Sequence, residues 1–317
     1  MWNEDFTDSS LDLAVWNIEV NGEGGGNNEL QYYCEKGVTI GQEPVSGKKC
    51  LVLTATKENY NEKKCTSGRV NTMDKMTYTY GMIEARIKFP NTANGLWPAF
   101  WQMGNSFKDV GWPKCGETDI IELGHQNAFN KGTQDRYFNG AMHLGSKWDA
   151  VWSDAQDVTW SYSVEDTFHI VSMVWTPNSI DMYMDREKNP TPYFHADLEP
   201  NENADYNRKL VFGKPNFIIA NLAVGGNFPG IYNIAGITAL AAGPRSMYID
   251  WIRIYQRGDE NQSFSCPSVS DPIEPDHTTG LETIDNEPVS GYKILKNGQI
   301  LILRNGQTYT ITGQIIQ

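Results

Sequence analysis

The stretch IEARIKF, residues 83–89, alternates apolar and charged side chains along its whole length. Ile83, Ala85, Ile87 and Phe89 share one parity, and the three residues between them are charged. Successive side chains of a β-strand point to opposite faces, so this stretch predicts a strand with one buried and one solvated side.

Other segments repeat or extend this pattern. SIDMYMD (179–185) alternates in the same way, whereas FHIVSMVW (168–175) and NFIIANLAV (216–224) are nearly continuous apolar runs, typical of strands buried on both faces. YIDWIRIYQ (248–256) closes the series. Turn residues separate the segments, and no stretch has the pattern of an amphipathic helix with caps. The sequence therefore predicts an all-β protein, an antiparallel sandwich or barrel.

Composition narrows the classes of function. The formal net charge of −13 over 317 residues argues against a nucleic-acid partner, which needs a basic surface. No apolar run is long enough for a membrane span. Ten Trp and fifteen Tyr suit either a sugar-binding surface or a large sandwich core. The start, MWNEDF, has no apolar signal core, which predicts a cytosolic protein or one whose signal has been removed.

The composition changes after Gln256. Residues 258–290 are rich in Pro, Ser and Asp and predict a linker between a domain over 1–257 and a small β-meander over 291–317. Asn-Gly pairs at 297–298 and 305–306 predict hairpin turns in the meander. This tail resembles C-terminal sorting signals of proteins secreted by certain Gram-negative bacteria, and the alternative is an accessory β-module.

The cysteines do not form a metal-binding motif. None of the five belongs to a CxxC pair, so no zinc site is expected. Pairing among Cys34, Cys50 and Cys65 is left open by the sequence, and the odd count leaves at least one thiol unpaired within the chain.

A second stretch, GETDIIEL (116–123), carries three acids among apolar neighbours. In a regular strand Glu117 and Asp119 share a face and Glu122 points the other way, about 16 Å from Glu117. A β-bulge at Ile120 and Ile121 corrects both the parity and the span, because it adds one residue to the strand. We therefore predict a bulge that turns Glu122 back to the face of Glu117.

Two carboxyl groups on one face suit cleavage of a glycosidic bond. Retaining hydrolysis uses a carboxylate nucleophile and a carboxylic acid about 5–5.5 Å apart. Mutual repulsion raises at least one pKa, as a general acid requires near neutral pH. The alternative is a solvated acidic strand, which does not explain three acids in an apolar run.

GWPKCGETDIIEL (111–123) closely resembles the bulged E-x-D-x-x-E signature of glycoside hydrolase family 16. The resemblance extends over residues 2–256 and is closest to the laminarinase and mixed-linkage β-glucanase branch. It is carried, in order along the chain, by WNEDF (2–6), NNELQYY (27–33), YGMIEARIKFP (80–90), GLWPAFWQMG (95–104), FHIVSMVWTPNSIDMYMD (168–185), NLAVGGNFPG (221–230) and YIDWIRIYQ (248–256).

The resemblance implies a jelly-roll β-sandwich of two curved antiparallel sheets with a concave substrate cleft. It implies Glu117 as nucleophile, Asp119 as its assistant and Glu122 as acid/base, with no cofactor in the reaction. It also implies a structural Ca²⁺ near Asp250, with backbone carbonyls completing the oxygen ligands that the ion prefers.

Eight further residues are candidates for holding the sugar. The family places a stacking tryptophan where Trp112 stands, and Trp97 and Trp101 share parity on one strand. Glu84 and Arg86 stand where the family often contacts sugar hydroxyls at the minus subsites. Asn221 is an amide that interrupts an apolar run, and His143 follows the catalytic strand. Asn27 is a similar candidate. The candidates are Trp112, Trp101, Trp97, Glu84, Arg86, His143, Asn221 and Asn27. For each, the alternative is a core or plain surface position.

These observations predict a secreted, monomeric endo-β-glucanase that cuts β-1,3- or mixed-linkage β-1,3/1,4-glucan. We expect it outside the cytoplasm of a Gram-negative bacterium, with secretion machinery as a partner of the tail. The alternatives are a hydrolase of an agar-like β-galactan, a transglycosylase, a glucan-binding protein without turnover and a structural surface protein.

Overall fold

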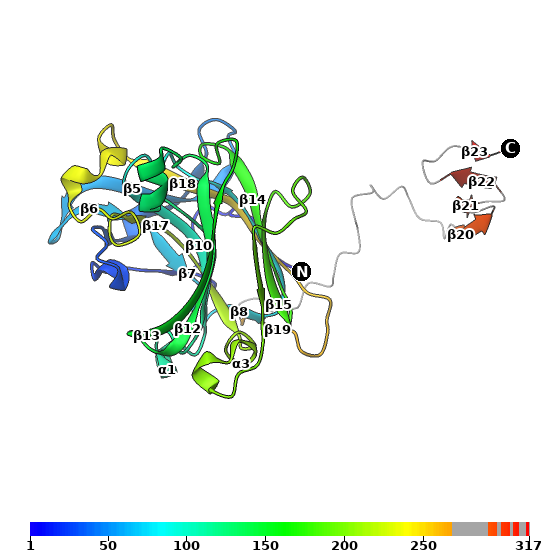
Figure 1. Ribbon diagram of the computed structural model, residues 1–317. Helices are drawn as coiled ribbons and strands as arrows, with labels where there is room; N and C mark the ends of the chain where they lie inside the picture. The colour runs from blue at the N-terminus through cyan, green and yellow to red at the C-terminus, as the bar shows by residue number, and fades with distance from the viewer. Residues whose placement is uncertain (268–290, 297–298, 305–306, 311–314, 317) are drawn as a thin grey trace. The chain divides into compact units, whose positions relative to one another are not determined.

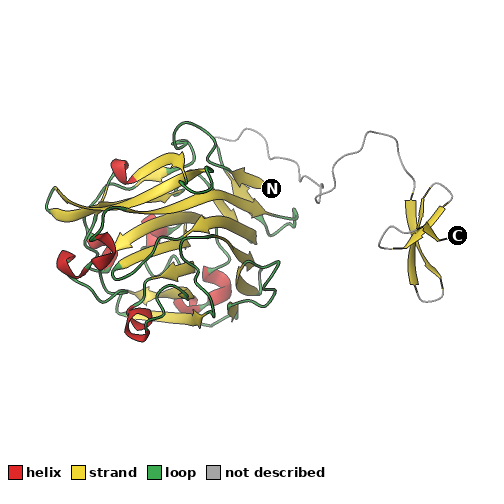
Figure 2. Cartoon of the chain, turned by 90° about the horizontal axis from the view of Figure 1, so that it is seen from above, coloured by secondary structure: helices red, strands yellow, loops and turns green. Residues whose placement is uncertain are grey.

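The computed structural model describes residues 1–267, 291–296, 299–304, 307–310 and 315–316. The chain divides into two compact units, Met1–Glu274 and Pro275–Gln317. The first unit consists of two large sheets packed as layers (Figure 1). Strands make up most of this unit, and short helices lie at its margins (Figure 2).

The first layer is a ten-stranded sheet. Its neighbours are antiparallel, except that β3 and β6 are parallel. β1 (Trp2–Glu4) pairs with β18, and β4 (Val38–Gln42) pairs with β5. The main path runs through β16 (Phe194–Asp197), β15 (Ser179–Met184), β14 (Phe168–Trp175), β9 (Gly81–Lys88), β18 (Arg245–Tyr255), β5 (Lys49–Tyr60), β6 (Lys63–Ser67) and β3 (Tyr32–Tyr33).

The second layer is a nine-stranded antiparallel sheet, which carries the acidic stretch on a central strand. β8 (Thr77–Thr79) pairs with β17, and β19 (Ser263–Ser265) pairs with β8. The main path runs through β13 (Ala150–Thr159), β12 (Tyr137–Lys147), β11 (Glu117–Leu123), β10 (Leu96–Gly104), β17 (Asn216–Val224), β7 (Arg69–Asn71) and β2 (Asn17–Ile18).

Helices are few and short in the described part of the chain. None of them is long and apolar enough to cross a membrane. The α-helices are α1 (Phe107–Val110), α2 (Gln126–Lys131) and α3 (Arg208–Val211), and single 3₁₀ turns are η1 (Gly24–Gly26), η2 (Glu35–Gly37), η3 (Ala204–Tyr206), η4 (Ile234–Gly236) and η5 (Thr238–Leu240).

The core lies between the facing sides of the two sheets. Ile83, Ala85 and Ile87 of β9 are fully buried there, and Phe100 of β10 and Leu222 of β17 meet them from the other layer. Burial of these apolar faces is the main force that holds the sheets together. The predicted all-β fold, a jelly-roll sandwich of two antiparallel sheets, is confirmed.

The first unit extends past the boundary predicted at residue 257. β19 adds Ser263–Ser265 to the edge of β8, and the side chain of Gln256 donates to the carbonyl oxygens of Thr79 and Ser263. The start of the predicted linker therefore belongs to the sandwich. The rest of it, 268–290, lies outside the described residues.

The second unit contains a four-stranded antiparallel sheet. Its order follows the chain, from β20 (Gly291–Lys296) through β21 (Gln299–Arg304) and β22 (Gln307–Thr310) to β23 (Ile315–Ile316). Both Asn-Gly pairs predicted as turns lie outside the described residues.

The sequence left open whether cysteines of the sandwich form disulfides, and the structure shows none among these residues. Cys34, Cys50 and Cys65 are buried free thiols, as is Cys115 beside the acidic stretch. Burial raises the pKa of the Cys115 thiol to about 12, so this side chain does not supply a thiolate nucleophile.

Candidate active site

The acid strand β11 contains the predicted bulge. The register with β10 shifts by one residue and leaves Ile120 unpaired, and the register with β12 shifts between Asp119 and Glu122. Ile120 and Ile121 are both fully buried in the core. On β12, the residues opposite Glu117, Asp119 and Glu122 are His143, Ala141 and Asn139. These three partners are two residues apart from one to the next, so their side chains share one face of the sheet, and so do the acids opposite them. All three acids therefore lie on the side of the sheet that faces away from the core.

Glycines bound the acid strand. Gly116 and Gly124 both have positive φ, +80° and +96°, which side chains rarely adopt. A Cβ at Gly124 would also lie 1.9 Å from the carbonyl oxygen of Leu96. These two positions let the chain enter and leave β11 sharply, which fixes where the strand begins and ends.

Glu117 and Asp119 form one hydrogen-bonded group with a histidine. Their carboxyls share a hydrogen bond, and Trp112 Nε1 donates to Glu117 Oε2 at 2.5 Å. His143 Nε2 lies 3.1 Å from Asp119 Oδ2, and its Nδ1 lies 2.7 Å from Ser153 Oγ. The aspartate is thus held from both sides, which fixes the carboxyl of Glu117 in position.

Glu122 is held by a separate indole. Trp97 Nε1 donates to Glu122 Oε1 at 2.8 Å, and the Trp97 ring stacks on Phe228 with centroids 4.7 Å apart. Trp97 is only 9% exposed, so its ring is a wall beside Glu122 and not an open platform for a sugar. The polar edge of Trp97 orients a carboxyl, and its predicted contact with substrate stays a prediction.

All three carboxyls have raised pKa values. Burial raises the pKa of Glu117 to about 8, and the charge of Asp119 adds to the effect. Burial also raises the pKa of Asp119 and moves the pKa of Glu122 well above its ordinary range. Glu122 holds its proton the more strongly of the two glutamates, because it is the more deeply buried. The hydrogen bond between Glu117 and Asp119 needs a second proton, and Glu117 is a carboxylate when that proton lies on Asp119. The group titrates as a unit, as expected for carboxyls in contact.

The Trp97 indole predicts a shift in the pH profile. Its N–H favours the ionised form of Glu122, so Trp97→Phe should raise the pKa of that carboxyl further. If Glu122 must be protonated to act, the alkaline limb of kcat/KM moves to higher pH, which a pH–rate profile measures.

Trp101→Phe is the matched control for this experiment. It removes an indole N–H on the same strand that donates to Asn221 instead of Glu122. The alkaline limb should stay in place in this variant. A limb that stays, or moves to lower pH, in Trp97→Phe would contradict the role assigned to the indole.

Trp101 lies on the acid face, opposite Asp119 on the neighbouring strand. Its Nε1 donates to Asn221 Oδ1 at 2.7 Å, and the guanidinium of Arg69 lies over its ring at 5.0 Å. Arg69 is itself held by Glu19 at 2.8 Å. The amide of Asn221 thus orients Trp101, and a sugar can stack only on the ring face that Arg69 leaves open.

Trp112 is the most open aromatic residue at the acids. Its side chain is 38% exposed while its N–H is bound to Glu117. A ring fixed by its edge, with a face in solvent, is suited to pack against a pyranose beside the nucleophile. Stacking of sugar on Trp112 and Trp101 stays a prediction.

The predicted sugar contacts of Glu84 and Arg86 are wrong. Both residues lie on β9 of the ten-stranded sheet, and their neighbours Ile83, Ala85 and Ile87 point into the core. Their side chains therefore point to the opposite side of the sandwich from the acids. Glu84 accepts a hydrogen bond from Ser172 Oγ at 3.0 Å, and the Arg86 guanidinium lies over the Phe168 ring.

The surroundings of Asp250 do not fit calcium. Its Oδ2 accepts a hydrogen bond from Arg86 Nη1 at 2.5 Å and lies 3.8 Å from Lys48 Nζ. Two cationic side chains already meet this carboxylate, whereas Ca²⁺ needs six to eight oxygen ligands. An ion pair between β18 and β9 takes the place that the resemblance implied for the metal.

Asn27 lies in the loop before β3. Its carbonyl oxygen accepts from the backbone N–H of Asn227 at 2.8 Å, and its Nδ2 lies 3.4 Å from the Gly25 carbonyl oxygen. It ties two surface loops together, and its predicted contact with substrate stays a prediction.

The structure adds four residues to the site that sequence reasoning missed: Arg69, Glu19, Phe228 and Ser153. Arg69 is the one charged residue in CTSGRVN (65–71), and an isolated charge in such a segment could have identified it as a candidate site residue. Glu19 and Phe228 carry no local signal, because each joins the site through a partner distant in sequence. Ser153 joins it from β13, where it lies opposite His143.

Glu117, Asp119 and His143 could also meet a metal ion, since one ligand atom of each lies within 4.8 Å of the others. In the described structure, however, these atoms already bond to one another. What the group offers directly is a carboxylate, a protonated carboxyl and hydrogen bonds that orient both. This set suits acid-assisted displacement at a sugar carbon.

A two-sheet sandwich with three acids on one bulged strand has the architecture and site of a glycoside hydrolase. Residues 32–212 match the model for glycosyl hydrolases family 16, and the chain belongs to this family.

Relatives and solved structures cover most of the chain. It is 33% identical over 263 residues to the clotting factor G alpha subunit of Tachypleus tridentatus, and 28% identical over 275 residues to glucan endo-1,3-beta-glucosidase A1 of Niallia circulans. Each match covers 81% of this chain but only 34% and 37% of the relative, so the chain spans about a third of their length. A family 16 structure from a Bacteroides ovatus mixed linkage glucan PUL, in complex with a G4G4G3G product, is 35% identical with a TM-score of 0.71, covering 80% of this chain and 99% of that chain.

Proposed function

We propose that the protein is an endo-acting β-glucanase that hydrolyses β-1,3- or mixed-linkage β-1,3/1,4-glucan with retention of configuration. The observation that carries this proposal is the bulge in β11, because it places Glu122 on the face of Glu117 and Asp119. Without the bulge, the chain would hold a nucleophile with no acid beside it.

The first step forms a glycosyl-enzyme ester. The carboxylate of Glu117 attacks the anomeric carbon, while Glu122 gives its proton to the glycosidic oxygen and the bond between that carbon and oxygen breaks. Asp119, which His143 holds, and the indole N–H of Trp112 both bond to the carboxyl of Glu117 and keep it in place. The shortened glucan leaves with the proton from Glu122.

The second step returns the enzyme to its starting state. Glu122, now a carboxylate, takes a proton from water as the water oxygen attacks the anomeric carbon, and the ester bond to Glu117 breaks. Two displacements at one carbon restore its original configuration. A sugar hydroxyl in place of water would give transglycosylation by the same route.

The choice of glucan rests on similarity together with the site. The similar protein from Niallia circulans is a glucan endo-1,3-beta-glucosidase, and the similar structure from Bacteroides ovatus carries a mixed linkage glucan product. The half-buried Trp101 and the exposed Trp112 beside the acids suit glucose rings, whose C–H faces pack on aromatic planes.

A substrate panel tests this proposal. Reducing ends released from laminarin, barley β-glucan, lichenan and agarose should appear with the glucans and not with agarose. Cellotriosyl and cellobiosyl units ending in a 1,3-linked glucose would identify a mixed-linkage enzyme, and laminari-oligosaccharides a β-1,3-glucanase.

The same panel distinguishes the alternatives. Cleavage of agarose alone would replace the glucan proposal with the β-galactan one. Retention on a glucan affinity gel without release of sugar would replace it with a glucan-binding protein.

A further inference from the structure

The bulge in β11 leaves the backbone of Ile120 without a partner in the sheet ladder. This residue has no partner in the register with β10, and it lies inside the shift in the register with β12. It is also fully buried. A buried carbonyl group outside the ladder needs a donor from elsewhere, because leaving it unpaired is costly.

The donor comes from the other sheet. Tyr193, the residue before β16, donates its hydroxyl hydrogen to the carbonyl oxygen of Ile120. Its ring meets Phe138 of β12 edge-on, with centroids 5.0 Å apart and planes at 87°. Burial raises the pKa of the Tyr193 phenol, so the hydroxyl stays protonated and remains a donor.

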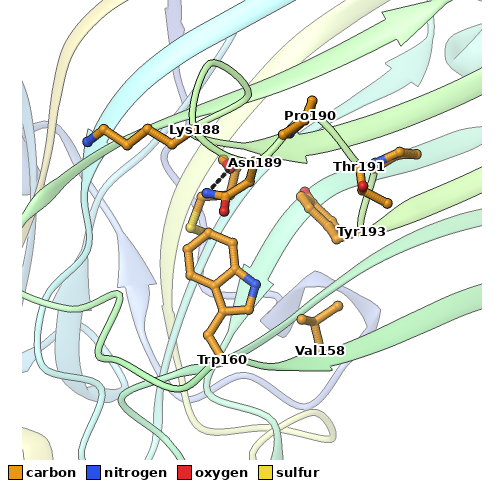
Figure 3. A pocket seen from close by; sticks show the side chains of 9 residues that line it. Val158, Trp160, Lys188, Asn189, Pro190, Thr191 and Tyr193 are labelled. Carbon is orange, nitrogen blue, oxygen red and sulfur yellow. Dashed lines mark hydrogen bonds between the residues drawn. The ribbon is translucent and has the colours of Figure 1, made fainter.

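Tyr193 stands at the side of the sandwich, where edge strands of the two layers meet. It lines a pocket of about 400 Å³ together with Val158, Trp160 and the loop that carries Lys188 and Thr191 (Figure 3). The ring is therefore reached from a surface away from the acids, although its hydroxyl ends at the strand that carries them.

A glycine on β12 makes room for this contact. A Cβ at Gly140 would lie 3.1 Å from Tyr193 Cε2 and 2.6 Å from Met182 Sδ. Gly140 stands between Asn139, which pairs with Glu122, and Ala141, which pairs with Asp119. Gly140 therefore lies beside the bulge, and the absence of a side chain there leaves space for the Tyr193 ring.

We propose that Tyr193 is a positioning residue for the acid/base: its hydroxyl fixes the Ile120 peptide in the orientation that presents Glu122 beside Glu117. Burial of Ile120 and Ile121 decides that a bulge forms. The hydrogen bond decides the tilt of the peptide two residues before Glu122, and with it the reach of that carboxyl. This inference rests on the proposed hydrolysis.

Tyr193→Phe tests the inference, because it keeps the ring and removes only the donor. The kcat/KM on β-glucan should fall about 10- to 100-fold, the effect of misplacing a general acid. The kcat/KM on a dinitrophenyl β-oligoglucoside should stay near that of the wild type, because this leaving group departs without a proton. Azide, a nucleophile that needs no general base, should accelerate turnover of the dinitrophenyl substrate and give a β-glycosyl azide.

The comparison of two substrates in one sample protects the test against loss of folded protein. A smaller folded fraction lowers both rates by the same factor and leaves their ratio unchanged. Equal loss on both substrates, or no loss on either, would overturn the inference.

Tyr78→Phe is the matched control. It removes another buried phenol hydroxyl, whose acceptor is Gln102 Oε1 at 2.5 Å and not the bulge. Its ratio between the two substrates should equal that of the wild type. Gly140→Ala, which pushes against the Tyr193 ring while keeping the hydroxyl, should reproduce the Tyr193→Phe ratio. A wild-type enzyme that attacks neither substrate would refute the proposed function itself, which is a different result.

Discussion

Glu117→Gln should lower kcat on β-glucan by at least about 10⁴-fold, the scale of losing an essential nucleophile. Glutamine keeps the shape and can still accept the hydrogen bond from Trp112 Nε1, but its amide does not form the ester intermediate. Glucan binding should be retained, which isothermal titration with an oligosaccharide measures beside the loss of turnover.

Glu84→Gln is the matched control for this substitution. It is the same chemical change on the far side of the sandwich, and the glutamine Oε1 can keep the hydrogen bond from Ser172. Its kcat should equal that of the wild type. Normal turnover by Glu117→Gln would remove the basis for the catalytic assignment.

The second large effect is expected from Glu122→Gln. Loss of general acid/base catalysis should lower kcat/KM on β-glucan by about 10²- to 10⁴-fold. The first step with a dinitrophenyl oligoglucoside should survive, because the leaving group needs no proton. Azide should then restore turnover and give a β-glycosyl azide.

This pattern separates the roles of the two glutamates. Glu117→Gln cannot be rescued by azide in the same way, because no glycosyl-enzyme forms. If Glu122→Gln lost equal activity on both substrates and did not respond to azide, the acid/base role would have to be assigned elsewhere.

The shared face of the three acids was predictable from the sequence, because GETDIIEL breaks the alternation of apolar and polar residues that a regular strand shows. Ile120 and Ile121 are both apolar in a strand where Glu117 and Glu122 have opposite parity, and a bulge is the local geometry that buries both isoleucines. The alternation of β9 and β15 and the apolar runs of β14 and β17 likewise predicted the sandwich. In these segments the local pattern and the final environment agree.

The location of Glu84 and Arg86 was not predictable in this way. Alternation shows that they leave the core, but each layer has an outer side, and the sequence does not say which one carries the acids. Asp250 shows the same limit, because its partners Lys48 and Arg86 come from distant segments of the chain.

Residues that act through long-range contacts left no local trace. Tyr193 bonds to a carbonyl 73 positions away, and Trp97 stacks on Phe228 from a loop beyond β17. Such pairs depend on how segments far apart in the sequence meet, which is a property of the packed fold and not of any one segment.

The central claim is that Glu117 is the nucleophile on a face it shares with Glu122. A dinitrophenyl oligoglucoside with fluorine at the 2-position of the reacting sugar tests it most directly, because fluorine slows both steps while the good leaving group keeps the first one fast enough to trap the ester. Mass spectrometry of the digested protein should find the fluoro-sugar on the peptide that contains β11, attached to Glu117. Attachment to Asp119 or Glu122, or no covalent adduct in an active enzyme, would contradict the account.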